Sequence, residues 1–463
     1  MAANPKVLVI GLDCAEPSLV FEQWRDELPN LSKLAGTGLW GPMESCMPAI
    51  TVPAWMTMMT SHQPGELGIY GFRNRADYSY ERMTMVTSKH VTLDTVWDIL
   101  SRQGKQCIVI GVPPSYPLKP INGAAISCFL TPSAKSQFTW PNELRTEVEA
   151  LVGEYMVDVS NFRTDDKDWL LGQIYLMTEK RFKVAKHWLR TRPWDFFMLM
   201  EIGVDRIHHA FWKYMDPLHP KHVPGNKYVN AIRDYYRFVD AHIGELLETL
   251  DDATSVLVVS DHGAKRMDGG IVFNEWLRRE GYLVLKSEPK EITPFAKVEV
   301  DWAKTRAWGE GGYYGRLFMN VQGREPQGLI PPARYEAERD ELVARLAGIA
   351  DDKGKNIGTT AYKPQAVYRA VRNVPPDLIV YFGDLYWRSI GSLGYDGIHT
   401  FDNDSGPDDA NHAQFGMFIL KEPVAGHSRR AQGAQIYDVA PTILHSMGLP
   451  VPGDMIGRDL RER

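Results

Sequence analysis

Carboxylate and imidazole side chains follow three separate apolar runs of the sequence, each at the point where the run ends. Asp13 follows VLVIGL, Asp205 and His209 follow FFMLMEIG, and Asp261 and His262 follow VLVVS. In an open parallel sheet, ligands bind beyond the carboxyl ends of the strands, where loops and helix N-termini converge. We therefore expect these five side chains to meet at one edge of a sheet.

The types and spacing of these residues are typical of a metal site. Asp205 and His209 are spaced i, i+4, so on a helical turn both point the same way, although His208 is a competing candidate. Asp261 and His262 are adjacent, and in a strand-end loop both can serve one ion. Oxygen and imidazole ligands suit zinc, and manganese or iron less specifically. One such pair alone is more often a turn with a satisfied histidine. The pairs together favour a site for two metal ions.

Thr51 begins the stretch TVPAWMTMMT, which has a helical composition. Threonine is a good helix cap and Pro53 suits a first turn, so we predict a helix from about residue 52. Capping alone would explain the threonine. A helix N-terminus also carries a partial positive charge that favours phosphate oxygens. A hydroxyl there, activated by a metal ion, would be a nucleophile facing a held phosphate.

The apolar runs themselves predict the fold. They are apolar at nearly every position, as strands buried on both faces require, and they occupy residues 6–13, 106–113, 195–203, 255–263 and 376–384. Amphipathic helical patterns lie between them, at residues 18–38, 92–105 and 228–250. Strands that alternate with helices favour an α/β fold with a doubly wound, mostly parallel sheet sandwiched by helices.

Two segments interrupt the alternation of strands and helices. Residues 131–190 are helical and polar without a clear buried strand, and residues 285–360 mix short strands, glycine pairs and a charged helix. We predict that both are insertions which fold over the sheet, the first helical and the second an α+β cap. The catalytic core would then comprise residues 1–130, 191–284 and 361–463.

Composition excludes several classes of protein. Hydrophobic residues make up 44% and charged residues 24% of the 463 residues, the balance of a soluble globular protein. The net charge is −6 and the charges are interleaved, so no polybasic tract predicts binding to a nucleic-acid polymer or to anionic lipid. No segment approaches the roughly 20 apolar residues that cross a bilayer. The expected partner is a small molecule, and the oligomeric state stays open.

Cysteine usage and the N-terminal residues indicate the compartment. The four cysteines lie in the first third of the chain and none forms a CxxC pair, so neither a disulfide framework nor a thiolate zinc site is predicted. The N-terminal apolar run VLVIGL is too short for a secretory signal. We expect a cytoplasmic protein.

The order of the motifs resembles the alkaline phosphatase superfamily. The motifs are VIGLDC, TVPAW, DRIHH, SDHG and the histidine ahead of FGMFIL. Within the superfamily, the sequence is most similar to the type I phosphodiesterase/nucleotide pyrophosphatase branch and its bacterial phosphohydrolase or phosphomutase relatives. The resemblance extends through FMNVQGREPQG, PPDLIV and residues 437–460, and so spans nearly the whole chain. It implies an alkaline phosphatase-like sheet with inserted cap segments.

The resemblance also implies a catalytic site with two divalent ions, Zn²⁺ first and Mn²⁺ as the alternative. One ion would be held by Asp205, His209 and His412, and the other by Asp13, Asp261, His262 and the oxygen of Thr51. Thr51 would attack phosphorus in line and form a phospho- or nucleotidyl-threonine, which water then cleaves. The predicted activity is hydrolysis of phosphate esters, with phosphodiester or nucleotide pyrophosphate-type bonds favoured.

Further residues and other activities follow from the same comparison. Relatives in this branch place an asparagine downstream of the nucleophile to hold a phosphate oxygen, and here ELGIYGFRN offers Asn74, or Arg73 beside it. Sulfatases need cysteine or serine in a CxPxR-like context, which TVPAW lacks. A phosphomonoesterase, or a phosphoryl transferase or phosphomutase using the same site, is the alternative. A non-catalytic metal-binding protein is least favoured, because the ligand set is complete.

Overall fold

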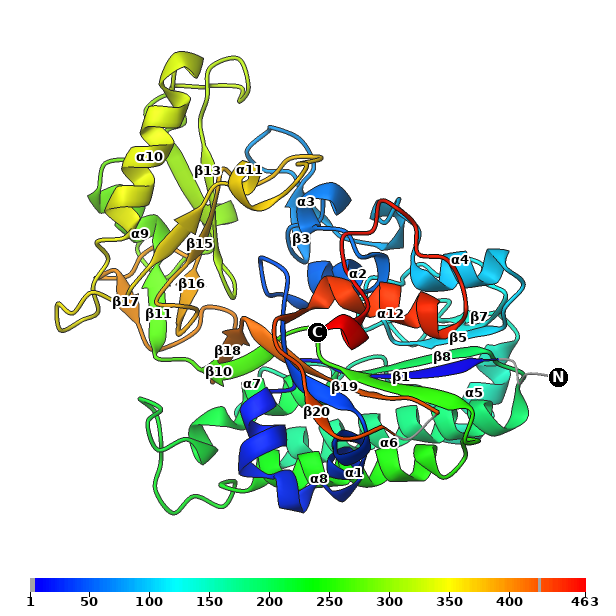
Figure 1. Cartoon of the computed structure of the whole chain (residues 1–463). Helices are drawn as coiled ribbons and strands as arrows, with labels where there is room; N and C mark the ends of the chain where they lie inside the picture. The colour runs from blue at the N-terminus through cyan, green and yellow to red at the C-terminus, as the bar shows by residue number, and fades with distance from the viewer. Residues whose placement is uncertain (1–4, 424–425) are drawn as a thin grey trace.

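Four of the five apolar runs of the sequence form the centre of a large sheet (Figure 1). Residues 5–423 and 426–463 are described by the structure, a computed structural model, and within them ten strands join this sheet. Five neighbouring strands are parallel, namely β9 (Thr254–Val259), β1 (Lys6–Leu12), β8 (Phe196–Glu201), β5 (Cys107–Ile110) and β6 (Gly123–Ile126). Every residue of β8 and β9 is buried, as strands covered on both faces require. The predicted α/β fold with a mostly parallel sheet is confirmed.

The two edges of the sheet include antiparallel strands. β19 (Phe415–Lys421) lies between β9 and β2 (Leu39–Glu44) and is antiparallel to both. Two short strands, β20 (Arg429–Arg430) and β21 (Ala434–Gln435), pair with β2, and β7 (Thr139–Trp140) pairs antiparallel with β6 at the other edge. The antiparallel β19 brings the C-terminal part of the chain back beside the central strands.

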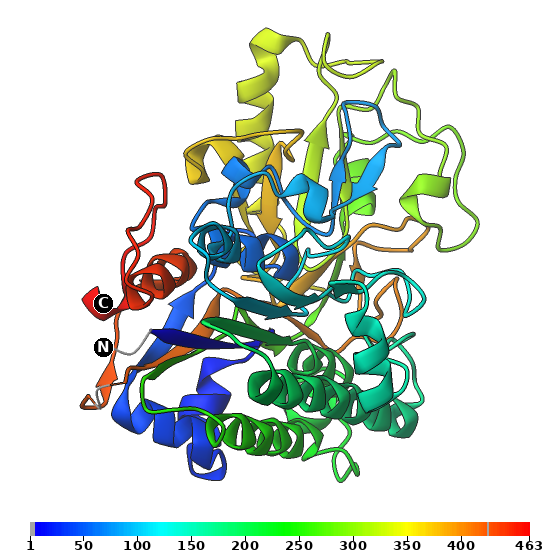
Figure 2. The ribbon, with the colours of Figure 1, turned by 90° about the vertical axis from the view of Figure 1, so that its right-hand side faces the viewer.

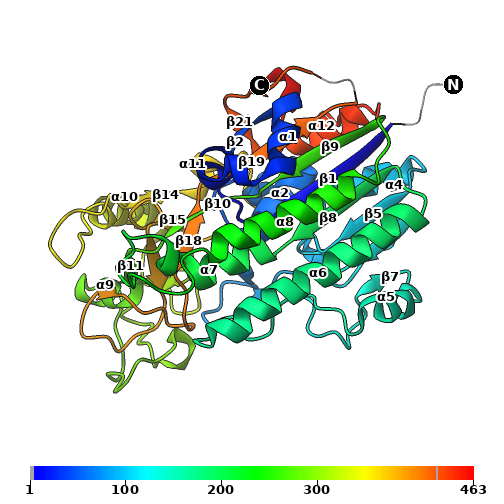
Figure 3. The same cartoon turned by 90° about the horizontal axis from the view of Figure 1, so that it is seen from below.

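Helices cover both faces of the sheet (Figure 2). One face carries α1 (Pro29–Thr37), α6 (Lys167–Thr191), α7 (Gly203–Met215) and α8 (Ala231–Leu247), which lie in front of the sheet in Figure 3. The other face carries α2 (Thr51–Thr60), α4 (Val96–Arg102) and α12 (Val439–Ser446). Among the described residues, no helix is both long enough and apolar enough to cross a membrane.

The helix α6 differs from its predicted role. It was predicted as part of a helical insertion over residues 131–190, but it packs on β8, α7 and α8. Its buried side chains include Ile174, Phe182 and Trp188. Lysine, arginine and glutamate on its outer side alternate with these apolar positions, so the segment has a polar composition although one of its faces is buried. The rest of this segment comprises β7, at the edge of the main sheet, and α5 (Leu144–Val152), which packs on α6.

A second lobe with its own hydrophobic core stands beyond the sheet, at the upper left of Figure 1. Its antiparallel sheet has the order β12 (Ala307–Glu310), β13 (Gly315–Met319), β15 (Leu378–Tyr381) and β14 (Thr360–Tyr362). A three-stranded sheet adds β16 (Trp387–Ile390), β11 (Gly269–Val272) and β17 (His399–Thr400). The helices of this lobe are α9 (Phe273–Arg279), α10 (Tyr335–Leu346) and α11 (Pro364–Val367). We call it the cap lobe.

The cap lobe is larger than the predicted insertion at residues 285–360. Its core includes Ile271 and Phe273 before that range and Val380 and Trp387 after it. The run at residues 376–384 was predicted as a strand of the parallel sheet, and this is wrong, because it forms β15 of the antiparallel cap sheet. A short, uniformly apolar run identifies a buried strand but does not say which sheet buries it.

A hairpin that follows α2 in the chain packs against the cap lobe. It follows α3 (Pro64–Leu67) and consists of β3 (Arg73–Arg75) and β4 (Met83–Met85). Arg75 forms a buried ion pair with Glu325 of the cap lobe at 3.2 Å, and the ring of Tyr80 stacks on Trp302 at 3.8 Å. The hairpin therefore packs with the cap although it belongs to the N-terminal part of the chain.

Removing a buried side chain from the central strands tests the fold. Leu199 of β8 is fully buried, so Leu199→Ala is expected to lower the free energy of unfolding by about 2–5 kcal/mol, the usual cost of a core cavity. Leu218 is 72% exposed, so the control Leu218→Ala should change it by about 0.5 kcal/mol or less. Urea unfolding followed by tryptophan fluorescence measures both, and equal effects would contradict the assigned burial.

Candidate metal centre

The predicted polar side chains meet beyond the carboxyl ends of β1, β8 and β9. Asp13 directly follows β1, Asp205 and His209 lie in the first turns of α7, and Asp261 and His262 directly follow β9. All five are at most 2% exposed. Parallel strands whose ends share one edge of the sheet are what bring residues so distant in sequence together.

His412 reaches the same place by a different route. It lies on β18 (Ala410–Ala413), which is antiparallel to β10 (Gly263–Arg266), and β10 continues directly from His262. The rings of His262 and His412 are stacked, with their centroids 3.8 Å apart. The short β10–β18 pairing therefore places His412 beside the side chains that follow β1, β8 and β9.

Three of the ligand candidates form one face of a tetrahedron. The Nε2 atom of His209 lies 3.2 Å from Oδ1 of Asp205 and 3.3 Å from Nε2 of His412, and the latter two atoms are 3.7 Å apart. Metal–ligand bonds of roughly 2.0–2.1 Å place tetrahedral ligand atoms about 3.3–3.4 Å apart. An ion of the size of zinc fits against these three atoms.

A second group lies beside the first. The Nε2 atom of His262 is 3.3 Å from Oδ2 of Asp261, 3.8 Å from Oδ1 of Asp13 and 3.4 Å from Oγ1 of Thr51. Among the described residues, Oδ1 of Asp13 and Oδ2 of Asp261 are buried without a hydrogen-bond partner. Buried carboxylate oxygens are almost always satisfied, so these two atoms point to a bound cation.

The second oxygen of each carboxylate is fixed by the protein. Trp55 donates its ring N–H to Oδ2 of Asp13 at 2.7 Å, and Arg206 donates to Oδ2 of Asp205 at 2.5 Å. The backbone N–H of Cys14 donates to Oδ1 of Asp261 at 3.2 Å. Each carboxyl group is thereby oriented with its remaining oxygen toward the centre, which is what a metal ligand requires.

The three histidines are oriented in the same way. The Nδ1 atom of His209 donates to Asp408 at 2.7 Å, that of His262 to the carbonyl of Gly263 at 3.1 Å, and that of His412 to the carbonyl of Ala49 at 3.0 Å. An acceptor at Nδ1 fixes the tautomer that leaves the Nε2 lone pair free for a metal. Asp408 is itself held by Arg388 at 2.5 Å and Arg163 at 3.3 Å.

Electrostatics show how strongly the centre requires positive charge. Burial, followed by the neighbouring carboxylates, raises the pKa of Asp13 and Asp261 well above the usual range. Burial also acts to raise the pKa of Asp205, but His209 and Arg206 hold it well below the usual value. A bound divalent cation reverses the effect at Asp13 and Asp261, because it stabilises their ionised forms.

Thr51 does not cap the helix that it was predicted to cap. It is the first residue of α2, whose N-cap is Ile50, and no side chain caps this helix. The Thr51 side chain is buried, with its hydroxyl facing His262. The helix was predicted to begin at about residue 52 with Thr51 as a possible cap, and it begins one residue earlier, with Thr51 inside it.

The remaining sequence candidates are placed as follows. His208 pairs with the hydroxyl of Tyr236 at 3.2 Å, and His209 is the member of the pair that joins Asp205. Asn74 accepts from the backbone N–H of Tyr70 and donates to the carbonyl of Gly68, both at 3.1 Å. Its amide therefore stabilises its own turn. Arg73, beside it, is exposed.

Side chains of the cap lobe hold the loop ahead of Thr51. Tyr381 accepts from the backbone N–H of Ala49 at 3.0 Å, and Tyr368 donates to the carbonyl of Met47 at 2.6 Å. The ring of Tyr313 stacks on His412, with their centroids 3.9 Å apart. The sequence predicted a cap but none of these contacts, since aromatic residues carry no signal of their spatial partners.

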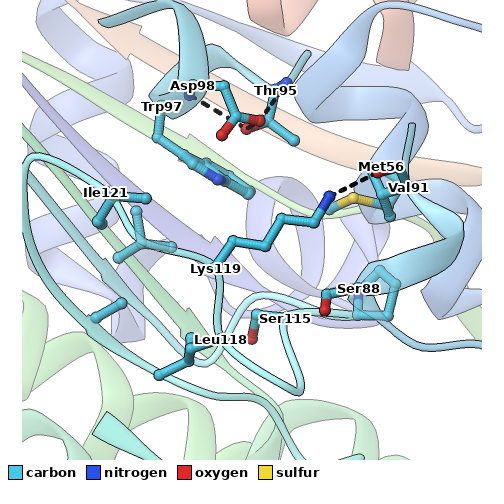
Figure 4. Close-up of a pocket in the computed structure, with 13 residues that line it drawn as sticks. Met56, Ser88, Val91, Thr95, Trp97, Asp98, Ser115, Leu118, Lys119 and Ile121 are labelled. Carbon is cyan, nitrogen blue, oxygen red and sulfur yellow. Dashed lines mark hydrogen bonds between the residues drawn. The ribbon is translucent and has the colours of Figure 1, made fainter. Parts of the chain in front are cut away.

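A separate apolar cavity lies beside α2 and α4 and contains none of the metal-ligand candidates (Figure 4). Met56, Trp97 and Ile121 line it, and Lys119 crosses it to donate to the carbonyl of Val91 at 2.7 Å. Its volume of about 40 Å³ has room for a few water molecules at most. It is too small to bind a phosphate ester.

The mixed α/β fold carries two groups of metal-ligand candidates at one edge of its main sheet. The family model for type I phosphodiesterase/nucleotide pyrophosphatase matches residues 7–408, and the chain belongs to this family. The protein is a phosphoester hydrolase, and its family is metal-dependent. The match ends before His412, so the position of this histidine comes from the structure.

A solved structure shows the same fold. Human ectonucleotide pyrophosphatase/phosphodiesterase 5 is similar with a TM-score of 0.55 and 14% identity, over 98% of this chain and 97% of that chain. A search of curated proteins returned no significant match. The family resemblance predicted from the order of the motifs is confirmed, as is the fold that it implied.

The contact between Asp408 and His209 predicts an effect on metal affinity. Asp408→Asn is expected to weaken metal binding by roughly 10–100-fold, because the neutral amide no longer holds the His209 ring in its ligating form. Competition with a chromophoric chelator measures the affinity. The adjacent Asp409 pairs with Lys213, so Asp409→Asn is the matched control and should leave the affinity unchanged. Equal losses in both variants would contradict this role of Asp408.

Proposed function

We propose that the protein is a two-metal phosphohydrolase that cleaves phosphodiester or nucleotide pyrophosphate-type bonds through a covalent threonine intermediate. One observation carries the proposal. The buried hydroxyl of Thr51 stands at the first residue of a helix, 3.4 Å from Nε2 of His262, a member of the second group of ligand candidates. A helix N-terminus attracts phosphate oxygens, so the substrate and the nucleophile would meet there.

The donor set fits two divalent ions. One would be held by Asp205, His209 and His412, and the other by Asp13, Asp261 and His262 together with the oxygen of Thr51. Oxygen and imidazole donors suit Zn²⁺ best, with Mn²⁺ as the alternative. When bound, the ions lower the pKa of the nucleophile and stabilise charge on the attacking and leaving oxygens.

The residues of this chain divide the work of two chemical steps. The Thr51 oxygen attacks phosphorus and the bond to the leaving group breaks, which gives a phospho- or nucleotidyl-threonine. Water then cleaves the bond between Thr51 and phosphorus, and the second in-line displacement restores the configuration at phosphorus. The contacts of Ala49 and Met47 with Tyr381 and Tyr368 hold the Thr51 backbone in place for both displacements.

The arginines around the centre favour diesters over monoesters. Arg206 pairs with Asp205 and Asp158, and Arg163 and Arg388 both pair with Asp408. Their charges are therefore already balanced by carboxylates. A phosphomonoester dianion needs more compensating charge than a diester monoanion. A substrate with one negative charge on the reacting phosphate suits these surroundings better.

Replacing the nucleophile tests the covalent step. Thr51→Ala is expected to lower the rate with bis-p-nitrophenyl phosphate by roughly 10³-fold or more, by analogy with other nucleophile deletions. Thr57 is buried on the same helix, so Thr57→Ala is the matched control and should retain most of the rate. Full activity of Thr51→Ala would refute the covalent threonine.

The same assay separates the alternatives. The wild-type protein should hydrolyse bis-p-nitrophenyl phosphate faster than p-nitrophenyl phosphate, and the opposite preference would indicate a phosphomonoesterase. With an added alcohol, water should remain the main acceptor of the phosphoryl group. Product analysis in which transfer to the alcohol replaces hydrolysis would indicate a phosphoryl transferase or phosphomutase.

Metal removal provides an independent prediction. Elemental analysis should find about two metal equivalents per chain, as a two-ion centre requires. Chelation should abolish the activity and added Zn²⁺ should restore it, because Asp13 and Asp261 bring buried charge that only a cation offsets. A chelated protein that keeps its full activity would exclude the two-metal mechanism.

A further inference from the structure

A thiol lies beside the first group of ligand candidates. The Sγ atom of Cys14 and the ligand atoms of Asp205, His209 and His412 all lie within 4.8 Å of one another. Cys14 is fully buried. The sequence predicted no thiolate metal site because no CxxC pair is present, but here the fold, and not a local motif, brings the thiol to the other donors.

The backbone at Cys14 is unusual. Its φ of 65° lies in the left-handed region, where a residue with a Cβ is disfavoured and glycine is preferred. This conformation lets the Cys14 N–H donate to Asp261 while Cys14 follows Asp13 directly. A non-glycine residue held in such a conformation beside a reactive centre points to a role for its side chain.

The thiol is available for another partner. It donates to the carbonyl of Gly263 at 3.3 Å, and a thiol is a weak hydrogen-bond donor. Exchanging this bond for a metal ion therefore sacrifices little. The three other donors already form one face of a tetrahedron, and the thiol is the fourth candidate beside them.

We propose that Cys14 is a fourth protein ligand of the ion held by Asp205, His209 and His412, an inference that rests on the two-metal function proposed above. On binding, the sulfur–hydrogen bond breaks, the proton passes to solvent, and the sulfur–metal bond forms. One thiolate, one carboxylate and two imidazoles would then hold the ion, a donor set that suits zinc.

The thiolate has a consequence for the choice of metal. Sulfur is a soft ligand that favours zinc, and it disfavours manganese and magnesium, which prefer oxygen donors. The second group has carboxylate, imidazole and hydroxyl donors without sulfur. The two ions are therefore expected to differ in selectivity, with the first position the more selective for zinc-like metals.

Cobalt substitution tests the bond directly. The full-length protein loaded with Co²⁺ should show a thiolate-to-cobalt charge-transfer band in the near ultraviolet, which oxygen and imidazole ligands do not produce. Cys14→Ser and Cys14→Gly should both lose this band. Glycine adopts the positive φ of residue 14 without strain. Loss of the band in Cys14→Gly would therefore reflect the missing thiol and not a misfolded backbone. Cys107 is buried on β5, and the control Cys107→Ser should keep the band.

Metal affinity gives the second measurement. Cys14→Gly should bind the first ion at least roughly tenfold more weakly. Removing a residue that only hydrogen-bonds to a metal ligand already lowers metal affinity by that factor, and removing a ligand should cost no less. Two bound cobalt ions without a charge-transfer band would overturn the role of Cys14 and leave the proposed function intact. A band that persists in Cys14→Ser would overturn it as well. A wild-type protein that binds no cobalt or zinc would overturn both proposals.

Discussion

The structure depends on the burial of three carboxyl groups in one small centre. Asp13, Asp205 and Asp261 are at most 2% exposed, and each has one oxygen fixed by a protein donor. Carboxylates this close and this buried repel one another unless positive charge lies among them. Arg206 supplies one such charge, for Asp205. One oxygen each of Asp13 and Asp261 lacks a hydrogen-bond partner, so the remaining positive charge would have to come from a bound cation.

Both lobes are needed to assemble this centre. The parallel strands β1, β8 and β9 deliver the carboxylates and two histidines, because their carboxyl ends share an edge. The third histidine arrives on β18, and its ring lies between His262 and the cap residue Tyr313. Tyr381 of the cap bonds both Ala49, ahead of the nucleophile, and Gln414, just after β18. The cap lobe therefore fixes the geometry of the centre as well as covering it.

The residues that the sequence offered as ligand candidates lie together in the structure, because strand ends carry a strong local signal. Three apolar runs are followed by an aspartate, and two of these also by a histidine, a pattern that marks one edge of the sheet. Asp408 and Cys14 have no such signal, since their roles depend on partners distant in sequence, His209 and Asp205. The strand β15 and the helix α6 were misplaced for a related reason. Periodicity shows that a segment is buried, but only tertiary contacts decide which layer buries it.

At the start of α2, contacts with the cap lobe override the local preference for threonine as the N-cap. Threonine is a far better N-cap than isoleucine, yet the helix begins with Ile50 as its N-cap and Thr51 as its first residue. A one-residue shift would cap the helix with the Thr51 hydroxyl and direct it to backbone N–H groups, away from His262. Ala49 and Met47 are bonded to cap-lobe tyrosines, which prevents that shift. The helix forgoes a stabilising cap, and the hydroxyl remains free to face the metal-ligand groups.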